Sequence, residues 1–488
     1  MTQLVDDRLD PKLLRLIGVV LLGGIMGILD STMVTVAAET LGREFHTSLS
    51  SISWSSTAYL LALTVTIPVT GWAVGRFGVR RLWLFGLSVF LVGSLASAVA
   101  WNVPSLTGFR VVQGLGAGIV DPLVLVILAR AAGPSRAGRV MGMMGVVLSL
   151  GPVLGPVLGG VVLDAVSWRW MFFINLPIGI VALALATRVI PADPPTESRS
   201  ASRLDAMGLV LMAPGLAATV FGLTRAGEQA RFDTLPVLVP LVLGVVFLAG
   251  YVAHALRVRR VAPLIDVRLF ASRAFAASVL VQGLVGVATY AGLFALPLYY
   301  QMVHDHGARA AGLLVAPLGL GSALAMPLTG RLSDRLGARN LVRGGALLAG
   351  LAAFALTRIN GDVGEVWSGL AGFAVGLGLG AVGAPTMGAL YRTLPPEKVP
   401  QGSSVLYNLN QFGGALGVAV VALVLATAGV GRTGVGESAG GFHNAYWFMV
   451  GVALVILVAT PLLPGRPQPV SSGGGRASLR TEGVHADG

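Results

Sequence analysis

Three ionisable side chains lie inside long apolar stretches of the sequence, where a charge is energetically expensive and its presence indicates a function. Asp30 and Arg110 fall in two different stretches, and Asp121 follows Arg110 in the same one. A buried carboxylate gains proton affinity from desolvation and loses it beside a guanidinium, so such groups can load and unload a proton. We therefore take these three residues as candidates for proton coupling.

The composition predicts a multi-pass membrane protein. Of 488 residues, 55% are hydrophobic and 11% are charged, whereas a soluble domain carries about a quarter of charged residues. There is no cysteine, which excludes disulfides, thiolate metal sites and cysteine nucleophiles. The first apolar run lacks a small-residue cleavage site after it, so we expect a retained span and not a signal peptide.

Fourteen stretches are long enough to cross a bilayer, and the one at 340–357 is the shortest. They are 13–38, 50–74, 82–102, 104–129, 139–164, 170–189, 205–225, 235–256, 274–302, 309–330, 340–357, 366–391, 401–428 and 443–463.

The distribution of Lys and Arg predicts the orientation. An even number of spans puts both termini on one side, and the loops on that side hold 20 Lys and Arg against seven in the opposite loops. The side richer in these residues is cytoplasmic by the positive-inside rule. We expect a multi-pass protein of the cytoplasmic membrane with both termini in the cytoplasm. The net charge of +12 then belongs to these loops, and no nucleic-acid partner is expected.

A loop motif occurs twice, as GWAVGRFGVRR at 71–81 and GRLSDRLGARN at 330–340, with an offset of 259 residues. Both copies follow a span on the cytoplasmic side, which is typical of transporters built from two parallel halves. The matched positions are Gly71 with Gly330, Arg76 with Arg335, Gly78 with Gly337 and Arg80 with Arg339.

The repeat predicts an all-α integral membrane protein of fourteen transmembrane helices, with two pseudo-symmetric six-helix halves and two inserted helices. The first half takes 1–190 and the second half 270–465. Between them, 191–269 is a linker that carries the two extra spans, and 466–488 is a disordered cytoplasmic tail.

A further motif, VLSLGPVLGPVLGGVVLD at 147–164, repeats glycine and proline at spacings of four in the fifth span. Prolines kink a helix, and glycines four apart allow close packing of another helix. We expect these steps to meet the span at 309–330 and to seal the outer side; an ordinary kinked span is the alternative. The motif residues are Gly151, Pro152, Gly155, Pro156, Gly159 and Gly160.

Together these motifs resemble the major facilitator superfamily, and specifically its fourteen-helix drug:proton antiporter group of multidrug efflux pumps. The loop repeat resembles the family's cytoplasmic gating motif, RVVQG at 110–114 its fourth-helix motif, and 147–164 the fifth-helix motif of exporters. Other matches are LDSTMVTVA at 29–37, SWRWMFFINLPIGI at 167–180, LDAMG at 204–208, PLIDVRLF at 263–270 and GSSVLYNLNQFGGALGVAV at 402–420.

One position departs from the family pattern: the first loop copy has Gly75 where the family usually has Asp, while the second copy keeps Asp334. The first gate is therefore expected to be latched differently. The resemblance implies export of hydrophobic or cationic drugs and antibiotics by alternating access, driven by the proton gradient without a cofactor. The expected partners are the small-molecule substrate, protons and the lipid bilayer, and we expect a monomer.

Helix geometry places Asp30 and Arg110 at one depth. At 1.5 Å per residue, Asp30 lies about 25 Å along the first span, and Arg110 about 9 Å from the outer end of the fourth. We predict that they form a switchable pair. The alternative is that Arg110 extends to the headgroups and Asp30 marks a helix break.

Asp121 lies deeper, nearer the cytoplasm. It is either a contact for a cationic substrate or a second proton site, or it pairs with a cytoplasmic-loop arginine and compensates for the missing acid at Gly75.

The second half offers aromatic and amide groups and almost no buried charge, which suits an apolar or weakly polar ligand. Hydrogen bonding between helices is the alternative role for any one of them. The predicted substrate-binding residues are Asp121, Gln113, Gln282, Tyr290, Tyr299, Tyr407, Asn408, Asn410 and Gln411.

No enzyme is expected. A GxGxxG at 378–383 lies in a membrane span with no strand before it, and the sequence has neither an HExxH pair nor a phosphate-binding loop. Competing hypotheses are a dedicated exporter of one endogenous metabolite or natural product, an importer, and a membrane-embedded protein that does not transport.

Overall fold

The computed structural model describes residues 10–133, 135–193, 203–258, 261–358, 365–430 and 435–465. The predicted tail at 466–488 lies outside these residues. Within the described parts, the chain forms helices joined by short connections and no strand.

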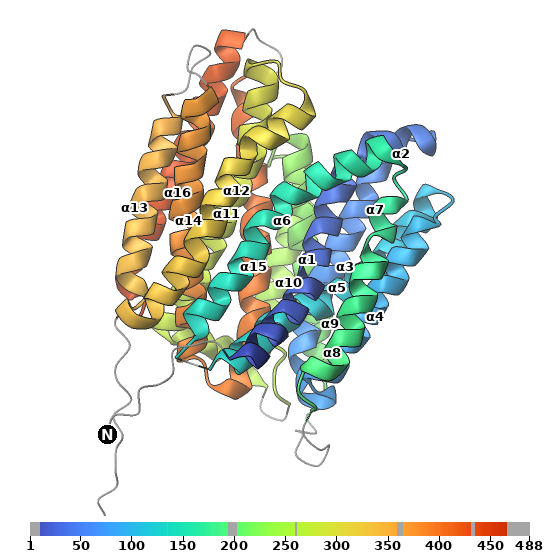
Figure 1. The fold of residues 1–488 in the computed structure, drawn as a ribbon, viewed down its shortest axis with the longest axis vertical. Helices are drawn as coiled ribbons and strands as arrows, with labels where there is room; N and C mark the ends of the chain where they lie inside the picture. The colour runs from blue at the N-terminus through green and yellow to red at the C-terminus, as the bar shows by residue number, and fades with distance from the viewer. Residues whose placement is uncertain are drawn as a thin grey trace, which may run out of the picture.

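The first six spans form one group of helices, on the right in Figure 1. They are α1 (Pro11–Val36), α3 (Leu49–Phe77), α4 (Val79–Ala98), α5 (Val103–Ala132), α6 (Ala137–Ala165) and the pair α7 (Trp170–Phe173) and α8 (Asn175–Val189), with a short α2 (Ala38–Glu44) after α1.

The last six spans form the other group, on the left. They are α11 (Arg273–Val303), α12 (Ala308–Leu336), α13 (Ala338–Leu356), α14 (Glu365–Thr393), α15 (Val399–Thr427) and α16 (Val435–Ala459), with short turns η2 (Val267–Ala271), η3 (Pro396–Lys398) and η4 (Thr460–Leu462). The division at 190 and 270 into domains stays a prediction.

Thirteen helices in the described residues are long and apolar enough to cross a membrane. The fourteenth, α13, misses that standard because Arg339 and Arg343 lie in its first turns. It nevertheless packs lengthwise on α14 and α16, and both arginines bond the chain just after α16. The protein is therefore an all-α membrane protein with the predicted fourteen spans.

The two inserted helices, α9 (Ala206–Gln229) and α10 (Leu235–Arg257), pack on each other. Glycines allow their close contact, because a Cβ at Gly244 would collide with Thr219 of α9. α9 also packs on α3 of the first group and on α15 of the second, and Phe221 stacks on Trp54 of α3 at 5.6 Å. The insertion thus touches both groups.

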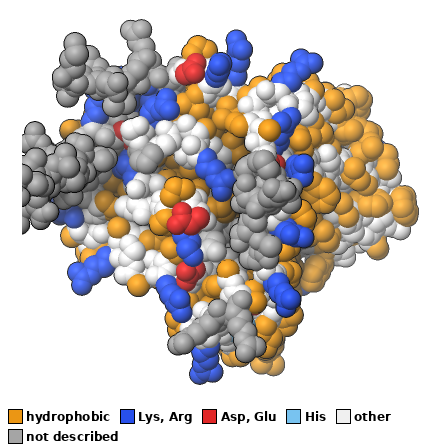
Figure 2. All heavy atoms as spheres, turned by 90° about the horizontal axis from the view of Figure 1, so that it is seen from below, with side chains coloured by type: hydrophobic (Ala, Val, Ile, Leu, Met, Phe, Trp, Pro, Cys, Tyr) orange, Lys and Arg blue, Asp and Glu red, His pale blue; other side chains and the backbone are white. Residues whose placement is uncertain are grey.

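Both loop-motif copies lie at the lower end of the bundle, which we call the motif end; the opposite end is the far end. Each copy turns on a glycine in the left-handed region, Gly78 with φ of 90° and Gly337 with φ of 81°. Only glycine adopts this region without strain. Figure 2 shows many Lys and Arg side chains and few acids at the motif end.

Close packing between the two groups is concentrated toward the motif end. The Cβ of an alanine at Gly138 of α6 would overlap the carbonyl of Gly330 in α12, and one at Gly142 would overlap that of Met326. Farther along, Ser149 Oγ bonds Ser322 Oγ at 2.9 Å. In Figure 1, α6 and α12 diverge toward the far end.

The 147–164 stretch meets the span at 309–330 as predicted, through Ser149 and through Val153, which lies against Gly319, but the glycines of the motif do not face that span. A Cβ added at Gly151, Gly155 or Gly159 would point at α1, where it would meet Ile28, Thr32 or Met33, respectively. Residues four apart share one helix stripe, and this stripe faces the neighbouring helix in the same group. α6 nevertheless continues unbroken through both of its prolines.

Candidate functional site

Asp30 and Arg110 form a buried ion pair inside the first group of helices. Their exposed fractions are 1% and 0%, and Arg110 Nη1 bonds Asp30 Oδ2. Gln113 closes a ring: it accepts from Arg110 Nη1 at 2.8 Å and donates to Asp30 Oδ1 at 2.8 Å. The predicted pairing is therefore present. The alternative in which Arg110 extends to the headgroups is wrong.

Asn175, at the start of α8, completes the cluster and was not predicted. Its Nδ2 donates to Asp30 Oδ1 and to Ser94 Oγ, both at 3.0 Å. Ser94 in turn donates to the carbonyl of Phe172. The signal for Asn175 was a single amide in the apolar run 170–189. We call Asp30, Arg110, Gln113 and Asn175 the ion-pair cluster.

Tyr59 of α3 connects the ion-pair cluster with Asp121. The guanidinium carbon of Arg110 lies 4.0 Å from the centre of the Tyr59 ring, and the Tyr59 hydroxyl donates to the carbonyl of Gly27 at 3.3 Å. A Cβ at Gly27 would lie 3.2 Å from Asp121 Oδ1 and 3.6 Å from the Tyr59 hydroxyl. The glycine thus leaves room for both groups.

A cavity of about 510 Å³ lies between the two groups of helices. Most of its lining is apolar, and α1, α3, α5, α9, α11 and α15 contribute to it. It extends from Asp121 toward Glu228 near the far end of α9. We call it the central cavity. Its wall from α9 was not predicted, because hydropathy does not say where an inserted helix packs.

Asp121 is 4% exposed and accepts a hydrogen bond from the Tyr407 hydroxyl at 2.6 Å. This bond joins α5 to α15 across the cavity. No arginine of the described residues pairs with Asp121, so the structure does not support the predicted alternative of a loop arginine. At Gly75, a Cβ would meet nothing within 4 Å.

Six of the predicted substrate residues line cavities. Asp121, Tyr290, Tyr407 and Gln411 line the central cavity. Two smaller pockets adjoin it, and both are lined by Gln282 and Asn410 as well as Tyr290.

The other three do not reach these cavities. Gln113 is used up in the ion-pair cluster. Tyr299 lies near the far end of α11, where it bonds His304 at 3.0 Å and packs against the Phe442 ring. Asn408 is 4% exposed, and neither of its amide atoms has a hydrogen-bond partner among the described residues. Residue type alone could not tell which helix face each side chain occupies.

In the second loop copy, Asp334 joins the two groups of helices. It accepts from the backbone N–H groups of Gly138 and Arg139, both at 2.9 Å, at the start of α6. Arg392 at the end of α14 donates to it at 2.7 Å. A carboxylate at a helix N-terminus satisfies otherwise unpaired N–H groups and complements the helix dipole.

In the first loop copy, which lacks the acid, two other carboxylates lie nearby. Asp193 accepts from the N–H groups of Arg80 and Arg81, both at 3.1 Å, at the start of α4. Asp266 pairs with Lys398 at 2.9 Å, just before α15. Burial raises the pKa of Asp266 and the Lys398 bond lowers it, with a net pKa below the ordinary value. The first loop copy was predicted to be held closed by other contacts than the second, and Asp193 and Asp266 are the carboxylates that lie near it. That role stays a prediction.

The loop arginines fill equivalent places. Arg80 donates to the carbonyl of Thr187 near the end of α8, and Arg339 donates to that of Leu463 after α16. Each half thus ties its loop motif to its own last helix. Among the described residues, no group of three or more His, Asp or Glu side chains is arranged to hold a metal ion.

A repeated pair of six-helix groups around a central cavity defines a membrane transporter of the Major Facilitator Superfamily, and the superfamily's sequence profile matches residues 20–418. The chain belongs to this family. It is 40% identical over 423 residues to the multidrug resistance protein B homolog of Mycobacterium tuberculosis, covering 86% of this chain and 77% of that one. It is 28% identical to the lincomycin resistance protein LmrB of Listeria monocytogenes, covering 90% and 94%. These relatives place it in the drug efflux group.

Solved structures agree on the fold. The human organic anion transporter MFSD10 superimposes with a TM-score of 0.65 at 17% identity, covering 93% of this chain and 100% of that one. The proton:xylose symporter XylE superimposes with a TM-score of 0.60 at 14% identity, covering 91% and 96%.

Proposed function

We propose that this protein is a proton-coupled antiporter that exports hydrophobic or cationic small molecules, drugs and antibiotics among them, across the cytoplasmic membrane. The observation that carries the proposal is the buried Asp30–Arg110 pair next to a large cavity that is lined by a second buried acid, Asp121. A buried ion pair is strongly destabilised when one partner loses its charge. Protonation of Asp30 is therefore an event that the surrounding helices must respond to.

In this proposal the motif end is cytoplasmic, because its loops carry the excess of Lys and Arg. The α6–α12 packing then closes the cytoplasmic side, and the central cavity lies on the outer side of it. The conformation is outward-facing, which is the state in which an exporter releases its substrate and accepts a proton.

Coupling would proceed through Tyr59. A proton on Asp30 neutralises its charge and leaves Arg110 without a counter-ion. The guanidinium, stacked on Tyr59, then raises the positive potential at the cavity wall where Asp121 lies. A cationic substrate at Asp121 is repelled and released, while a neutral substrate responds only to the accompanying movement of helices.

The lining of the cavity supports the substrate class. A mostly apolar surface selects by shape and hydrophobicity, and Asp121 supplies one negative charge. The relatives named for multidrug and lincomycin resistance support drugs and antibiotics as substrates.

The test is uptake into everted vesicles by the Asp30→Asn variant. Wild-type protein should concentrate a drug in an ATP-independent manner that collapses with an ionophore, while Asp30→Asn, fixed in the neutral form, should lose concentrative uptake. Asp233→Asn, which changes an exposed acid paired with Arg231, is the matched control and should behave as wild type. Concentrative, gradient-driven uptake by Asp30→Asn would contradict the coupling role.

A further inference from the structure

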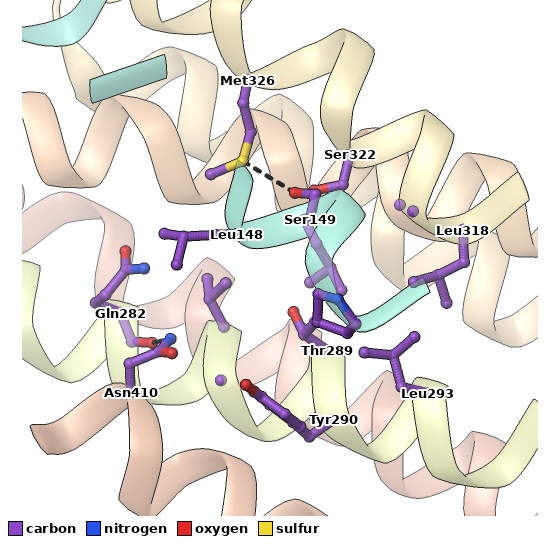
Figure 3. Close-up of a pocket in the computed structure, with 16 residues that line it drawn as sticks. Leu148, Ser149, Gln282, Thr289, Tyr290, Leu293, Leu318, Ser322, Met326 and Asn410 are labelled. Carbon is purple, nitrogen blue, oxygen red and sulfur yellow. Dashed lines mark hydrogen bonds between the residues drawn. The ribbon is translucent and has the colours of Figure 1, made fainter. Parts of the chain in front are cut away.

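Beside the central cavity lies a smaller pocket of about 60 Å³, which we call the inner pocket. It is formed by α6, α11, α12, α14 and α15. In Figure 3, Gln282 and Asn410 lie on one side of it, Tyr290 lies below, and Ser149, Ser322 and Met326 lie opposite. The inner pocket is mostly apolar, and both groups of helices contribute polar side chains to its lining.

Gln282 is the unusual member of this pocket. It is 3% exposed, and its Oε1 has no hydrogen-bond partner among the described residues. Buried amides in native proteins are almost always paired, because an unpaired acceptor keeps its full desolvation penalty. An acceptor held in this way beside a cavity is suited to an N–H or O–H group of a ligand.

The backbone is shaped to keep this amide at the pocket. Asn410 Nδ2 donates to the main-chain carbonyl of Gln282 at 3.2 Å, which fixes α11 against α15. A Cβ at Gly286, one turn along α11, would lie 3.1 Å from the Asn410 amide nitrogen. Glycine therefore permits the close contact that places Gln282 and Asn410 together.

Tyr290 lies between the inner pocket and the central cavity. It lines both of them, and it also lines a third pocket of about 40 Å³ that shares Gln282 and Asn410 with the inner pocket and Tyr407 with the central cavity. The three pockets therefore adjoin one another around Tyr290, with Gln282 on the side away from the central cavity.

The central cavity and the inner pocket differ in the charge of the side chains that line them. Asp121 lines the central cavity, whereas none of the described residues lining the inner pocket is charged. A cation would find no counter-charge there to compensate for the loss of its hydration. The group that matches the inner pocket is small, uncharged and a hydrogen-bond donor.

We propose that the inner pocket is a specificity subsite, in which Gln282 binds an uncharged hydroxyl or amide N–H substituent of the transported molecule. This inference rests on the proposed transport function. In this arrangement, Asp121 and the apolar walls bind the body of the substrate. Gln282 distinguishes the polar substituents of the substrate.

The experiment compares two probes that differ by one hydroxyl, tetraphenylphosphonium and (4-hydroxyphenyl)triphenylphosphonium, in equilibrium binding to the purified full-length protein. One hydrogen bond predicts about three- to tenfold tighter binding of the hydroxylated probe. Gln282→Leu should abolish this preference and leave the affinity for tetraphenylphosphonium within about twofold. Gln282→Glu, which keeps an acceptor oxygen, should retain the preference.

Asn408→Leu is the matched control. Asn408 is also a buried amide without a partner, but it lines none of the three pockets, so the preference should persist in that variant. Thermal unfolding distinguishes a merely structural role of Gln282. Gln282→Leu should unfold at the same temperature as the wild type or at a higher one. A lower unfolding temperature, together with an unchanged preference for the hydroxylated probe, would overturn the subsite. Equal affinity of the wild type for both probes, including no binding of either, also overturns it. A clear preference without gradient-driven uptake would instead overturn the antiport function and leave the subsite standing.

Discussion

At the scale of single residues, the site residues that could be predicted from the sequence are mainly the charged ones, because burying a charge is energetically costly. Asp30 and Arg110 stand out in apolar sequence, and their helices run in opposite directions, so a common depth follows from counting residues. Asn175 and Tyr59 could not be found in this way, because a neutral amide or phenol in a span is cheap enough to occur for many reasons. Their roles become visible only when distances to Asp30 and Arg110 are known.

Asp121 is the residue whose substitution separates cation binding from proton coupling. Asp121→Asn removes the acidic side chain that lines the central cavity where Tyr407 donates to it; the other acid among the described lining residues, Glu228, lies toward the far end. We expect the affinity for tetraphenylphosphonium to fall about tenfold, as for loss of a charged partner, and gradient-driven export of uncharged drugs to persist.

The measurement is a comparison of cationic and uncharged drugs in the same vesicles, with Tyr407→Phe as a second variant that keeps the charge. Uniform loss of transport for both drug classes, with normal expression, would show that Asp121 is a second proton site. Uniform loss of folded protein would point to a structural role.

At the scale of helices, periodicity and length predicted all fourteen spans, including the short α13, but not the partner of each helix face. A stripe of glycines fits any neighbour with a ridge of side chains, and nothing in the sequence at 147–164 chooses α1 over α12. The loop repeat was easier to predict than the helix partners. Gly78 and Gly337 each provide the positive φ that the turn needs, and this requirement is local to each loop.

The glycine stripe of α6 makes a prediction with a built-in control. An alanine Cβ at Gly155 would overlap Thr32 Oγ1, whereas one at Gly160 would meet nothing within 4 Å. Thr32 is β-branched and its hydroxyl bonds the carbonyls of Ile28 and Leu29, so it cannot move aside easily. Gly155→Ala should be destabilised by about 1–3 kcal/mol, and Gly160→Ala should not.

Thermal unfolding of the two variants in one detergent gives the comparison, and export assays show whether loss of α1–α6 packing also disturbs Asp30. Equal unfolding temperatures for Gly155→Ala and the wild type would mean that the motif is ordinary packing that relaxes freely.

At the scale of the whole molecule, the alternating access that we propose depends on contacts that join the two groups of helices. Asp334 is such a contact, since it lies on α12 and accepts from the first N–H groups of α6. Asp193 makes similar bonds to α4, but it lies just after α8 in the linker and so contacts only the first group of helices through them. The sequence pointed to Asp334 through the repeat, but it did not show which helix the acid caps.

We therefore expect Asp334→Asn to shift the protein away from the conformation with a closed motif end, and Asp193→Asn to leave the balance unchanged. Loss of hydrogen bonds to a charged group, about 1.5–3 kcal/mol, corresponds to a shift of tenfold or more. A cysteine placed at Val418 in the central cavity reports it, because the chain has no other cysteine. Its labelling by an impermeant thiol reagent from the far end should slow in Asp334→Asn; unchanged labelling would remove Asp334 from the gate.

The position of α9 has a consequence for how far the protein can move. Because α9 packs on α3 and on α15, a rotation of one half against the other must make it slide on at least one of these helices. Sliding is inexpensive in a bilayer, since lipid tails are as apolar as the side chains that they replace. In the alternating-access cycle that we propose, α9 is thus a wall of the central cavity whose contacts with α3 or α15 change as the two halves move.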